Sequence, residues 1–396
     1  MIGYQSQGKM PKKPHTAFRK PEGGIYFEQC ITQDGFEGSF SILYHEQAPQ
    51  RIHSGQTTTP LWPQPQHFKN DTPEPLRRRH FRSQDFQPFG SPCTGRLPMM
   101  FNDTTTIGVV KPQKNDDFYF CNGDGDDLFY IHQGGGTLIS WFGKLDFNEG
   151  DFLVIPRGTL HRFQLKKELT QHWFWVESTT SIVPPEHYRN PTGQLRMDAP
   201  YTHRDFKTPV LTHNIDPDGP RRQITKKRGY FTVHQNSDDP MDTVGWDGTI
   251  YPYVFAMDDF SPKTGQVHLP PTTHATFATQ HALICSFVPR FVDFGEDAVT
   301  CPYPHSNVDI EEVLFYADGD FTSRKGTSSG SMSFHPSGVP HGPHPGAYEK
   351  SIGVRQVQER AVMLDVKGPL FVSPQAREVE DRNYDESWFN QTGEKS

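Results

Sequence analysis

Three residues in the stretch from Pro302 to Glu349 have side chains of the kinds that bind divalent metals. They are His305, Glu312 and His341. Two imidazoles with one hard carboxylate suit iron(II), and three protein ligands on one side of the ion leave coordination positions open for a substrate and for O2. Surface histidines on turns are the alternative interpretation, and for one histidine alone it would be the better one. The three residue types together predict oxygenase chemistry.

The spacing of these residues is more specific than their types. The chain contains two motif blocks, His305-x-Asn307-x4-Glu312-x6-Gly319 and Gly330-x5-Pro336-x-Gly338-x2-His341. These blocks resemble the paired signatures of the cupin superfamily, which implies a small β-barrel of the jelly-roll or double-stranded β-helix type. Residues i, i+2 and i+4 of a strand share a face, so ligands on neighbouring strands of such a barrel can converge inside it.

The composition predicts an all-β fold. The chain of 396 residues contains 34 glycines, 35 prolines and 30 phenylalanines. Helical periodicity is scarce, and this combination is typical of many short strands joined by turns. A chain of this length has room for two or three domains, so two barrels fit within it.

The charge and the cysteines exclude several function classes. The formal net charge is −8, whereas binding to nucleic acid or to an anionic membrane needs an excess of Lys and Arg. The basic cluster at residues 77–82 is interpreted as a solvated or inter-subunit loop. Five cysteines without a C-x-x-C pair indicate no disulfide framework and favour a reducing compartment. With no signal-peptide pattern and no long apolar run, we expect a cytoplasmic protein without nucleic-acid or membrane partners.

An internal repeat predicts a second, related barrel. The block from Gly150 to His161 matches the block from Gly330 to His341 at every signature position, at an offset of 180 residues. Just upstream, Asp127 to Gly134 aligns with Glu312 to Gly319. Self-similarity of this kind indicates duplicated structural units. The sequence therefore predicts two cupin barrels in one chain, a bicupin.

The two copies differ at one ligand position. Phe120 stands in the first copy where His305 stands in the second, and a phenylalanine ring cannot ligate a metal. Asp127 and His161 keep ligand chemistry in the first copy, which leaves a weak first site as the alternative. We expect the first barrel to be metal-free.

These patterns predict four segments along the chain. They are an N-terminal arm and β extension (1–95), the metal-free cupin barrel (96–180), an irregular connection (181–243), and the catalytic cupin barrel with a C-terminal tail (244–396).

The second barrel also resembles the homogentisate 1,2-dioxygenase family. The resemblance is carried by Tyr303 to Asn307, Pro340 to Pro343 and Tyr348 to Lys350, and weaker matches at Val244 to Trp246 and Tyr251 to Tyr253 extend it along the chain. It implies an Fe(II)-dependent homo-oligomeric enzyme of tyrosine and phenylalanine catabolism. Such an enzyme uses O2 to cleave the aromatic ring of homogentisate, giving maleylacetoacetate.

The resemblance also implies roles for individual residues. The iron ligands fall on His305, Glu312 and His341, and substrate-binding roles fall on Tyr303 and His335. One ligand is ambiguous. Counting forward from His305 by the family spacing reaches Glu311, whereas counting back from Gly319 reaches Glu312, which the internal repeat also selects.

The proton acceptor has two candidates. The family's general base lies in a His-x-x-Pro context, which His268 matches, and His274 is its rival because the following segment differs in length. Histidine titrates near neutral pH, so it can accept a proton from a phenol. Phe321 stands near the position at which the family commonly has a substrate-contacting tyrosine, so another aromatic diol such as gentisate remains an alternative substrate.

Two other function classes compete with the dioxygenase interpretation. A bicupin isomerase or hydrolase would use the metal on sugar or ester oxygens. A non-catalytic bicupin, for storage or small-molecule binding, would normally have lost ligands in both barrels. The joint presence of His305, Glu312 and His341 disfavours the second of these.

Overall fold

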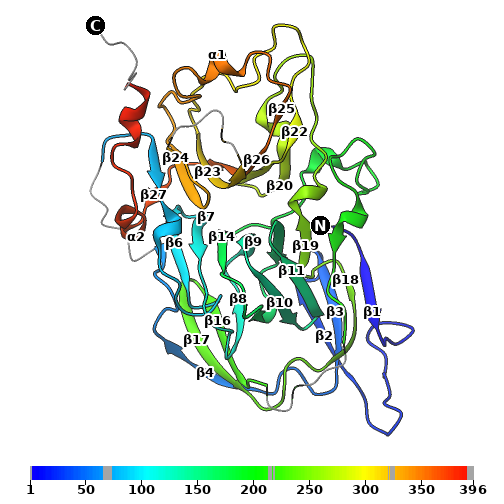
Figure 1. Ribbon diagram of the computed structural model, residues 1–396. Helices are drawn as coiled ribbons and strands as arrows, with labels where there is room; N and C mark the ends of the chain where they lie inside the picture. Colours follow the sequence, from blue (N-terminus) through cyan, green and yellow to red (C-terminus); the bar gives the residue numbers. More distant parts are fainter. Residues whose placement is uncertain are drawn as a thin grey trace, which may run out of the picture.

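The regular secondary structure of the chain consists almost entirely of strands (Figure 1). The computed structural model describes residues 2–65, 74–212, 216, 219–319, 321 and 326–389. In this described part, no helix is longer than five residues: α1 (Ala347–Ser351), α2 (Pro374–Glu378), and the 3-10 turns η2 (Ser83–Asp85), η3 (Glu186–Tyr188), η4 (His203–Asp205), η5 (Met257–Asp259), η6 (Pro271–His274) and η7 (Tyr384–Trp388). The all-β prediction is confirmed, and no helix of the described residues could cross a membrane.

The first barrel has two sheets facing each other. The eight-stranded sheet has the order β15 (Phe206–Lys207), β19 (Tyr253–Ala256), β12 (Asp151–Ile155), β9 (Asp126–Gln133), β14 (His172–Ser178), β7 (Thr105–Val110), β6 (Arg96–Phe101) and β27 (Phe371–Val372). The seven-stranded sheet has the order β11 (Gly143–Asn148), β10 (Gly135–Ser140), β13 (Leu160–Leu165), β8 (Tyr119–Asn122), β16 (Arg222–Lys227), β17 (Tyr230–Asn236) and β4 (Ile52–Thr58).

Aromatic side chains fill the space between these two sheets. Phe129 and Trp175 from the eight-stranded sheet share one buried cluster with Phe120 and Phe163 from the seven-stranded sheet. The rings of Phe129 and Phe163 lie 5.6 Å apart in an edge-to-face arrangement, a favoured geometry for packed aromatic pairs. The first barrel therefore has a side-chain core in place of an open interior.

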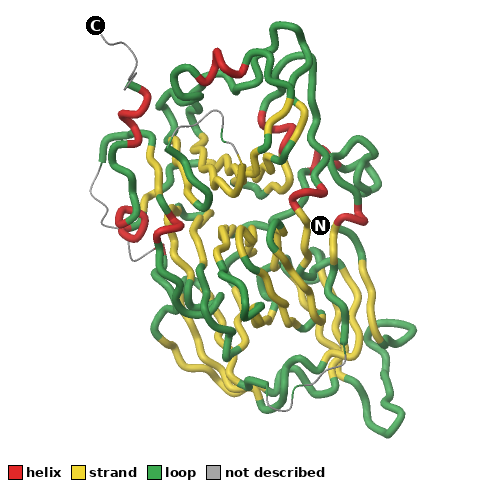
Figure 2. Tube along the Cα trace, viewed as in Figure 1, coloured by secondary structure: helices red, strands yellow, loops and turns green. Residues whose placement is uncertain are grey.

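The second barrel has one regular wall. This is a six-stranded sheet with the order β20 (Ala275–Ala278), β21 (Ala282–Phe287), β26 (Glu359–Lys367), β23 (Ile310–Gly319), β24 (Ser331–His335) and β5 (Arg79–Phe81). The opposite wall is formed mostly by loops (Figure 2), with the short pair β22 (Arg290–Phe291) and β25 (Gln356–Val357) and a single bridge between His305 and His341. The two predicted barrels are thus present, and the second is the less regular of them.

The two barrels pack through a shared apolar core. Alternate residues of the eight-stranded sheet, including Tyr130 and Phe174, join Val313 and Phe315 of β23 in one buried cluster. The rings of Phe174 and Phe315 lie 5.1 Å apart. Because successive side chains of a strand point to opposite faces, burial of Val313 and Phe315 between the barrels directs Glu312 into the second barrel.

The outer segments differ in part from the predicted division. A four-stranded sheet joins β1 (Gln5–Gly8), β18 (Thr243–Gly248), β3 (Phe40–His45) and β2 (Phe27–Thr32). Within residues 181–243, where an irregular connection was expected, β16 and β17 form a hairpin whose turn residues Arg228 and Gly229 both have positive φ, as tight hairpin turns require. The buried Lys226 of β16 pairs with Glu177. This ion pair allows a charged side chain of the strand to be buried.

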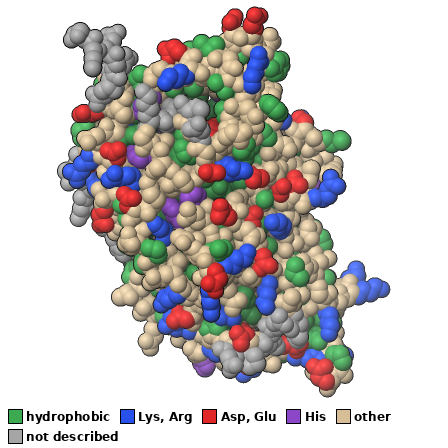
Figure 3. Space-filling model, in the orientation of Figure 1, with side chains coloured by type: hydrophobic (Ala, Val, Ile, Leu, Met, Phe, Trp, Pro, Cys, Tyr) green, Lys and Arg blue, Asp and Glu red, His purple; other side chains and the backbone are tan. Residues whose placement is uncertain are grey.

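The basic cluster at residues 77–82 pairs with the C-terminal part of the chain and is not a solvated loop. Arg79 binds Glu380 at 2.9 Å and Arg78 binds Asp385 at 2.7 Å. Acidic and basic side chains are interspersed over the face of the molecule in Figure 3.

Candidate metal centre

Strand alternation separates the two neighbouring carboxylates of β23. Glu312 points into the second barrel, whereas the Glu311 carboxylate accepts hydrogen bonds from the backbone N–H of Leu370 at 2.5 Å and of Ser337 at 3.4 Å. Burial raises the pKa of Glu311, and these hydrogen bonds oppose the shift. Glu312 is therefore the carboxylate that lies beside the histidines, as the internal repeat predicted.

His305 and His341 lie side by side on the loop wall. Each accepts a backbone hydrogen bond from the other at 2.8 Å. The Nδ1 of His305 lies 3.2 Å from the carbonyl of Tyr303, and that of His341 lies 3.0 Å from the carbonyl of Val339. A carbonyl accepts only, so Nδ1 must carry the proton in both rings and Nε2 keeps its lone pair. Both lone pairs are thereby available to a cation.

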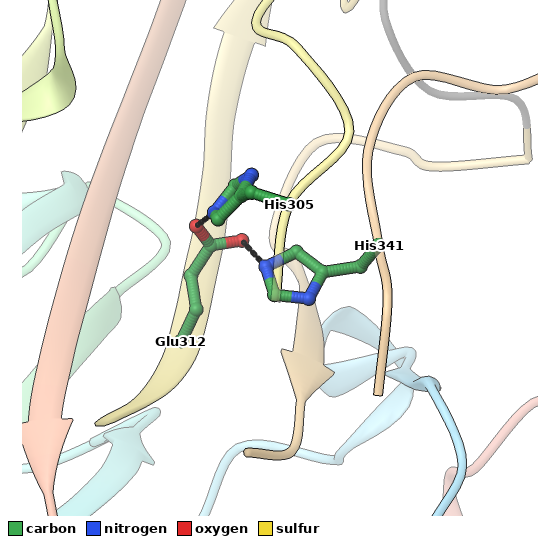
Figure 4. Close-up of side chains that lie close together, drawn as sticks. All are labelled: His305, Glu312 and His341. Carbon is green, nitrogen blue, oxygen red and sulfur yellow. Dashed lines mark ion pairs between the residues drawn. The ribbon is translucent and has the colours of Figure 1, made fainter. Parts of the chain in front are cut away.

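The three side chains converge on one point (Figure 4). The Nε2 of His305 lies 3.8 Å from Oε2 of Glu312, and the Nε2 of His341 lies 3.8 Å from Oε1. Their ligand atoms all fall within 4.8 Å of one another. Donors that each lie about 2.1 Å from one ion are separated by at most about 4.2 Å, so the two separations of 3.8 Å fit a shared metal. Two imidazoles and one carboxylate are a donor set that suits iron(II).

His335 lies behind the carboxylate. It is the cross-strand partner of Glu312, its Nδ1 lies 2.6 Å from Oε1 of Glu312, and its side chain is 0% exposed. Its ring stacks on that of His341 at 4.7 Å with an interplanar angle of 14°. The sequence prediction gave His335 a substrate contact, and the structure brings it to the ligand set.

A cavity adjoins these residues on the side of His305 and Glu312. Its wall is partly apolar, with Phe287, Leu314 and Met363, and both base candidates, His268 and His274, line it. Phe321 lines it too. Tyr303 is half exposed, and its ring lies 5.9 Å from that of His268 and 6.4 Å from that of His305. His268, His274 and Phe321 therefore surround one space, and Tyr303 lies beside His268 and His305.

His268 has a charged partner that the sequence did not reveal. Its Nδ1 lies 3.6 Å from Oδ2 of the buried Asp293. Burial lowers the pKa of His268, Asp293 opposes that shift, and Arg290 reinforces it. Burial also lowers the pKa of His274, and the nearby charges of Arg290 and His268 lower it further, to about 3. Both rings are neutral above pH 6.5, the state in which imidazole accepts a proton.

Sequence reasoning also missed the charged residues of the cavity wall. Arg290 pairs with Glu359 at 2.9 Å, and both line the cavity. Asp365 stands opposite Glu312 on β26, and burial together with the Glu312 charge raises the pKa of Asp365 to about 7. Arg290 ends the apolar run that begins at Ala282. Apart from its charge, nothing in the sequence indicates that its side chain lies on the cavity wall.

The equivalent place in the first barrel holds an arginine. Arg96 binds Asp127, the counterpart of Glu312, at 2.8 Å, and both side chains are fully buried. The Arg96 guanidinium carbon lies 5.3 Å from the ring centre of Phe120 and 4.6 Å from that of Trp62. His161, the counterpart of His341, keeps the same contact between Nδ1 and a carbonyl two residues earlier. A cationic side chain thus neutralises Asp127 where a metal would otherwise be needed.

Comparisons with known proteins show which family the chain resembles. Residues 102–257 match the family model described as homogentisate 1,2-dioxygenase N-terminal, and residues 253–394 match the C-terminal one. A protein of Saccharolobus solfataricus named "Putative dioxygenase" is 35% identical over 396 residues, covering 98% of this chain and 100% of that protein. The homogentisate 1,2-dioxygenase of Bradyrhizobium diazoefficiens is 26% identical over 274 residues, which are 66% of this chain and 60% of that enzyme.

Among solved structures, a cupin 2 conserved barrel domain protein from Leptotrichia buccalis aligns over 73% of this chain and 96% of its own, with 10% identity and a TM-score of 0.36. The fold and the site define a bicupin protein in which the second barrel carries two histidines and a glutamate. The chain belongs to the homogentisate 1,2-dioxygenase family, because the two family models cover most of its length.

Proposed function

We propose that this protein is an Fe(II)-dependent dioxygenase that cleaves the aromatic ring of homogentisate with O2, giving maleylacetoacetate. The observation that carries the proposal is the convergence of His305, Glu312 and His341 beside a partly apolar cavity in a member of this family. Both atoms of O2 end in the product, so the reaction needs no external reductant. Iron(II) held by these three residues would supply the electron transfer between ring and O2 that the reaction requires.

In this proposal the remaining residues bind and orient the substrate. Phe287, Leu314 and Met363 offer apolar surface to an aromatic ring. His268 accepts the phenol proton at Nε2 while Asp293 faces its Nδ1, and the half-exposed Tyr303 is the hydrogen-bond partner that we assign to a ring substituent. Positioned groups of this kind lower the barrier by fixing the reacting atoms and by moving a proton as the bond changes occur.

Arg290 offers a positive group to an acidic substrate. It lies on the cavity wall, where it pairs with Glu359 at 2.9 Å. Phe321, at the rim, offers no hydroxyl to the substrate and forms an edge contact of 4.8 Å with Tyr316. The family commonly has a substrate-contacting tyrosine near the position of Phe321. The second candidate substrate is therefore another aromatic diol with an acid group, such as gentisate.

The test is oxygen uptake by Fe(II)-loaded protein with homogentisate, gentisate and simple catechols. We expect uptake with homogentisate, equal in moles to the product formed, and little with catechols that lack an acid group. The control is Glu312→Gln treated with Fe(II) in the same way, because this substitution removes the carboxylate from the set of three proposed ligands. Uptake with gentisate alone would keep the reaction class and change the substrate, and uptake with none of these diols would overturn the proposal.

We extend the proposal to the organisation of the chain. The residues of the proposed catalytic site all lie within 244–396, a stretch that also contributes β19 and β27 to the sheet of the first barrel. Residues 96–180 belong to a barrel without a resident metal. Exposed apolar side chains on the loop wall, such as Phe291, Phe294 and Val308, support a homo-oligomer. The expected location is the cytoplasm, in agreement with the five free cysteines.

A further inference from the structure

His335 is placed to act on Glu312. The two residues are directly paired across β23 and β24, and Nδ1 of His335 lies 2.6 Å from Oε1 of the carboxylate. A carboxylate next to an imidazole at this distance receives a short, strong hydrogen bond. His335 is fully buried and is not among the residues that line the cavity. Glu312, its hydrogen-bond partner, does line that cavity.

This hydrogen bond fixes a side chain that would otherwise rotate. The terminal torsion of glutamate is broad, and on its other flank Glu312 faces Asp365, which stands directly opposite on β26. The His335 donor holds Oε1 on the β24 side and turns Oε2 toward Nε2 of His305, 3.8 Å away. His335 also stacks on His341, so one ring contacts two of the three candidate ligands.

We propose that His335 is a positioning residue that orients Glu312 and His341 for the metal and does not contact the substrate. The inference rests on the proposed metal site and deepens it. Outer residues that hydrogen-bond ligating carboxylates fix their orientation, and their loss typically costs about 10- to 100-fold in metal affinity. The role differs from the substrate contact that the family resemblance implied for His335, and the two roles predict different measurements.

The experiment compares two substitutions at this position. Asparagine carries its amide nitrogen where histidine carries Nδ1, so His335→Asn keeps the donor, whereas His335→Leu removes it at similar volume. Fe(II) affinity is measured by anaerobic titration of the metal-free proteins. We expect His335→Leu to bind Fe(II) about 10- to 100-fold more weakly and His335→Asn to recover most of that loss. At saturating Fe(II), the KM for the diol should stay close to the wild-type value in both.

A matched control is His80, which is also a fully buried histidine and lies on β5, next to β24. Its ring stacks on that of Tyr384 at 5.0 Å. His80→Leu should therefore leave Fe(II) affinity unchanged. Circular dichroism shows whether each variant folds, and His335→Gln, whose amide lies one bond further out, replaces His335→Leu if that variant does not.

Each result has a distinct meaning. Unchanged Fe(II) affinity in His335→Leu with a raised KM would overturn the positioning role and favour the substrate contact. Equal losses in His335→Leu and His335→Asn would also overturn it, because the donor would then be irrelevant. If Fe(II) binding depends on His335 as expected but no diol supports oxygen uptake, the positioning role stands and the proposed reaction fails. If wild-type protein binds no Fe(II), both fail together.

Discussion

At the scale of single residues, the pair Glu311 and Glu312 shows how one position along a strand decides a role. Glu311 lies on the face of Val313 and is held by backbone N–H groups, whereas Glu312 faces two imidazoles. We expect Glu312→Gln to abolish tight Fe(II) binding and activity, because an amide oxygen is a far weaker ligand than a carboxylate. Metal analysis after desalting measures this loss directly.

Glu311→Gln is the control for that substitution. It should keep metal and activity, and it should lower stability by about 1 to 3 kcal/mol, because the hydrogen bonds to a buried charged group weaken. Urea unfolding measures that cost. Loss of iron from Glu311→Gln with retention in Glu312→Gln would move the ligand by one residue and contradict the register of β23.

The base candidates differ in their surroundings. We expect His268→Gln to retain iron and to lose on the order of 10^2- to 10^4-fold in kcat, the usual contribution of a positioned acid or base. The loss should shrink at high pH, because a phenol with a pKa near 10 then arrives already ionised. His274→Gln should cost far less, since its ring is buried against Phe287 at 4.8 Å.

The pH profile tests the partner of this base. Burial and Arg290 lower the pKa of His268, so its neutral form persists below pH 6.5 and the acid limb of kcat/KM should lie there. Asp293 opposes this shift. Asp293→Asn should therefore move the acid limb to still lower pH. A limb that stays in place in Asp293→Asn would show that another group controls it.

At the residue level, the sequence predicted proximity where the spacing itself encodes geometry. The positions of His305, Glu312 and His341 follow from motif spacing and strand alternation. Asp293 and Arg290 had no such signal, because their proximity to His268 depends on how a loop folds over the cavity. The contact between His335 and Glu312 depends on the pairing register of β23 with β24, which strand alternation alone does not fix.

At the scale of elements, the contact between β9, β14 and β23 joins the barrels. Two buried histidines occupy it: His132 of β9 and His172 of β14 lie 5.2 Å apart, and both pack against Phe315. Burial lowers the pKa of His132 to about 4 and that of His172 well below its usual value. The charges that face His132 are Asp318, which opposes the shift, and Lys111, which reinforces it.

This pair predicts an acid-sensitive inter-barrel contact. A histidine with a folded pKa below its unfolded value of about 6.5 contributes stability that is present above pH 6.5 and is lost as the pH falls toward 4. For His132 alone the loss between pH 7.5 and 5 is about 2 kcal/mol. His132→Gln keeps a donor for Ser329, which lies 3.2 Å from Nε2, and removes the titration.

Urea midpoints at pH 7.5 and 5 measure this difference. The wild-type protein should lose about 2 kcal/mol more than His132→Gln over that range. His53→Gln is the control, because His53 is exposed. A loss in His132→Gln as large as in the wild-type protein would place the acid sensitivity elsewhere.

Element prediction from sequence was accurate for the repeated blocks and poor outside them. Alternating or continuous apolar runs identified β9, β12 and β23, since burial on one or both faces leaves that pattern. β16 was not predicted because its sequence is polar. Its buried Lys226 is stabilised by an ion pair with Glu177, a residue that is distant in sequence. The loop wall of the second barrel also differs from the seven-stranded sheet that is its counterpart in the first barrel. The sequence repeat covers the motif blocks but not β10 and β11 of that sheet.

At the scale of the whole molecule, the two related barrels differ in what fills their interiors. The first holds a buried ion pair between Arg96 and Asp127 within an aromatic cluster. The second keeps an open cavity with three converging ligands. The eight-stranded sheet of the first barrel supports β23 across the shared apolar core. The first barrel therefore serves as a rigid support for the sheet that carries Glu312.

This asymmetry predicts about one tightly held iron per chain, as one complete ligand set requires. The equivalent residues His341 and His161 provide matched variants, because the repeat places them at the same position of the two barrels. His341→Gln should lose the metal and His161→Gln should retain it. Fe(II) should also raise the melting temperature of wild-type protein and of His161→Gln, since a ligand that binds the folded state stabilises it by RT ln(1 + [L]/Kd), and should leave His341→Gln unchanged. Metal analysis that gives about two irons per chain, or iron loss from His161→Gln, would show that the first barrel holds a metal in spite of Arg96 and Phe120.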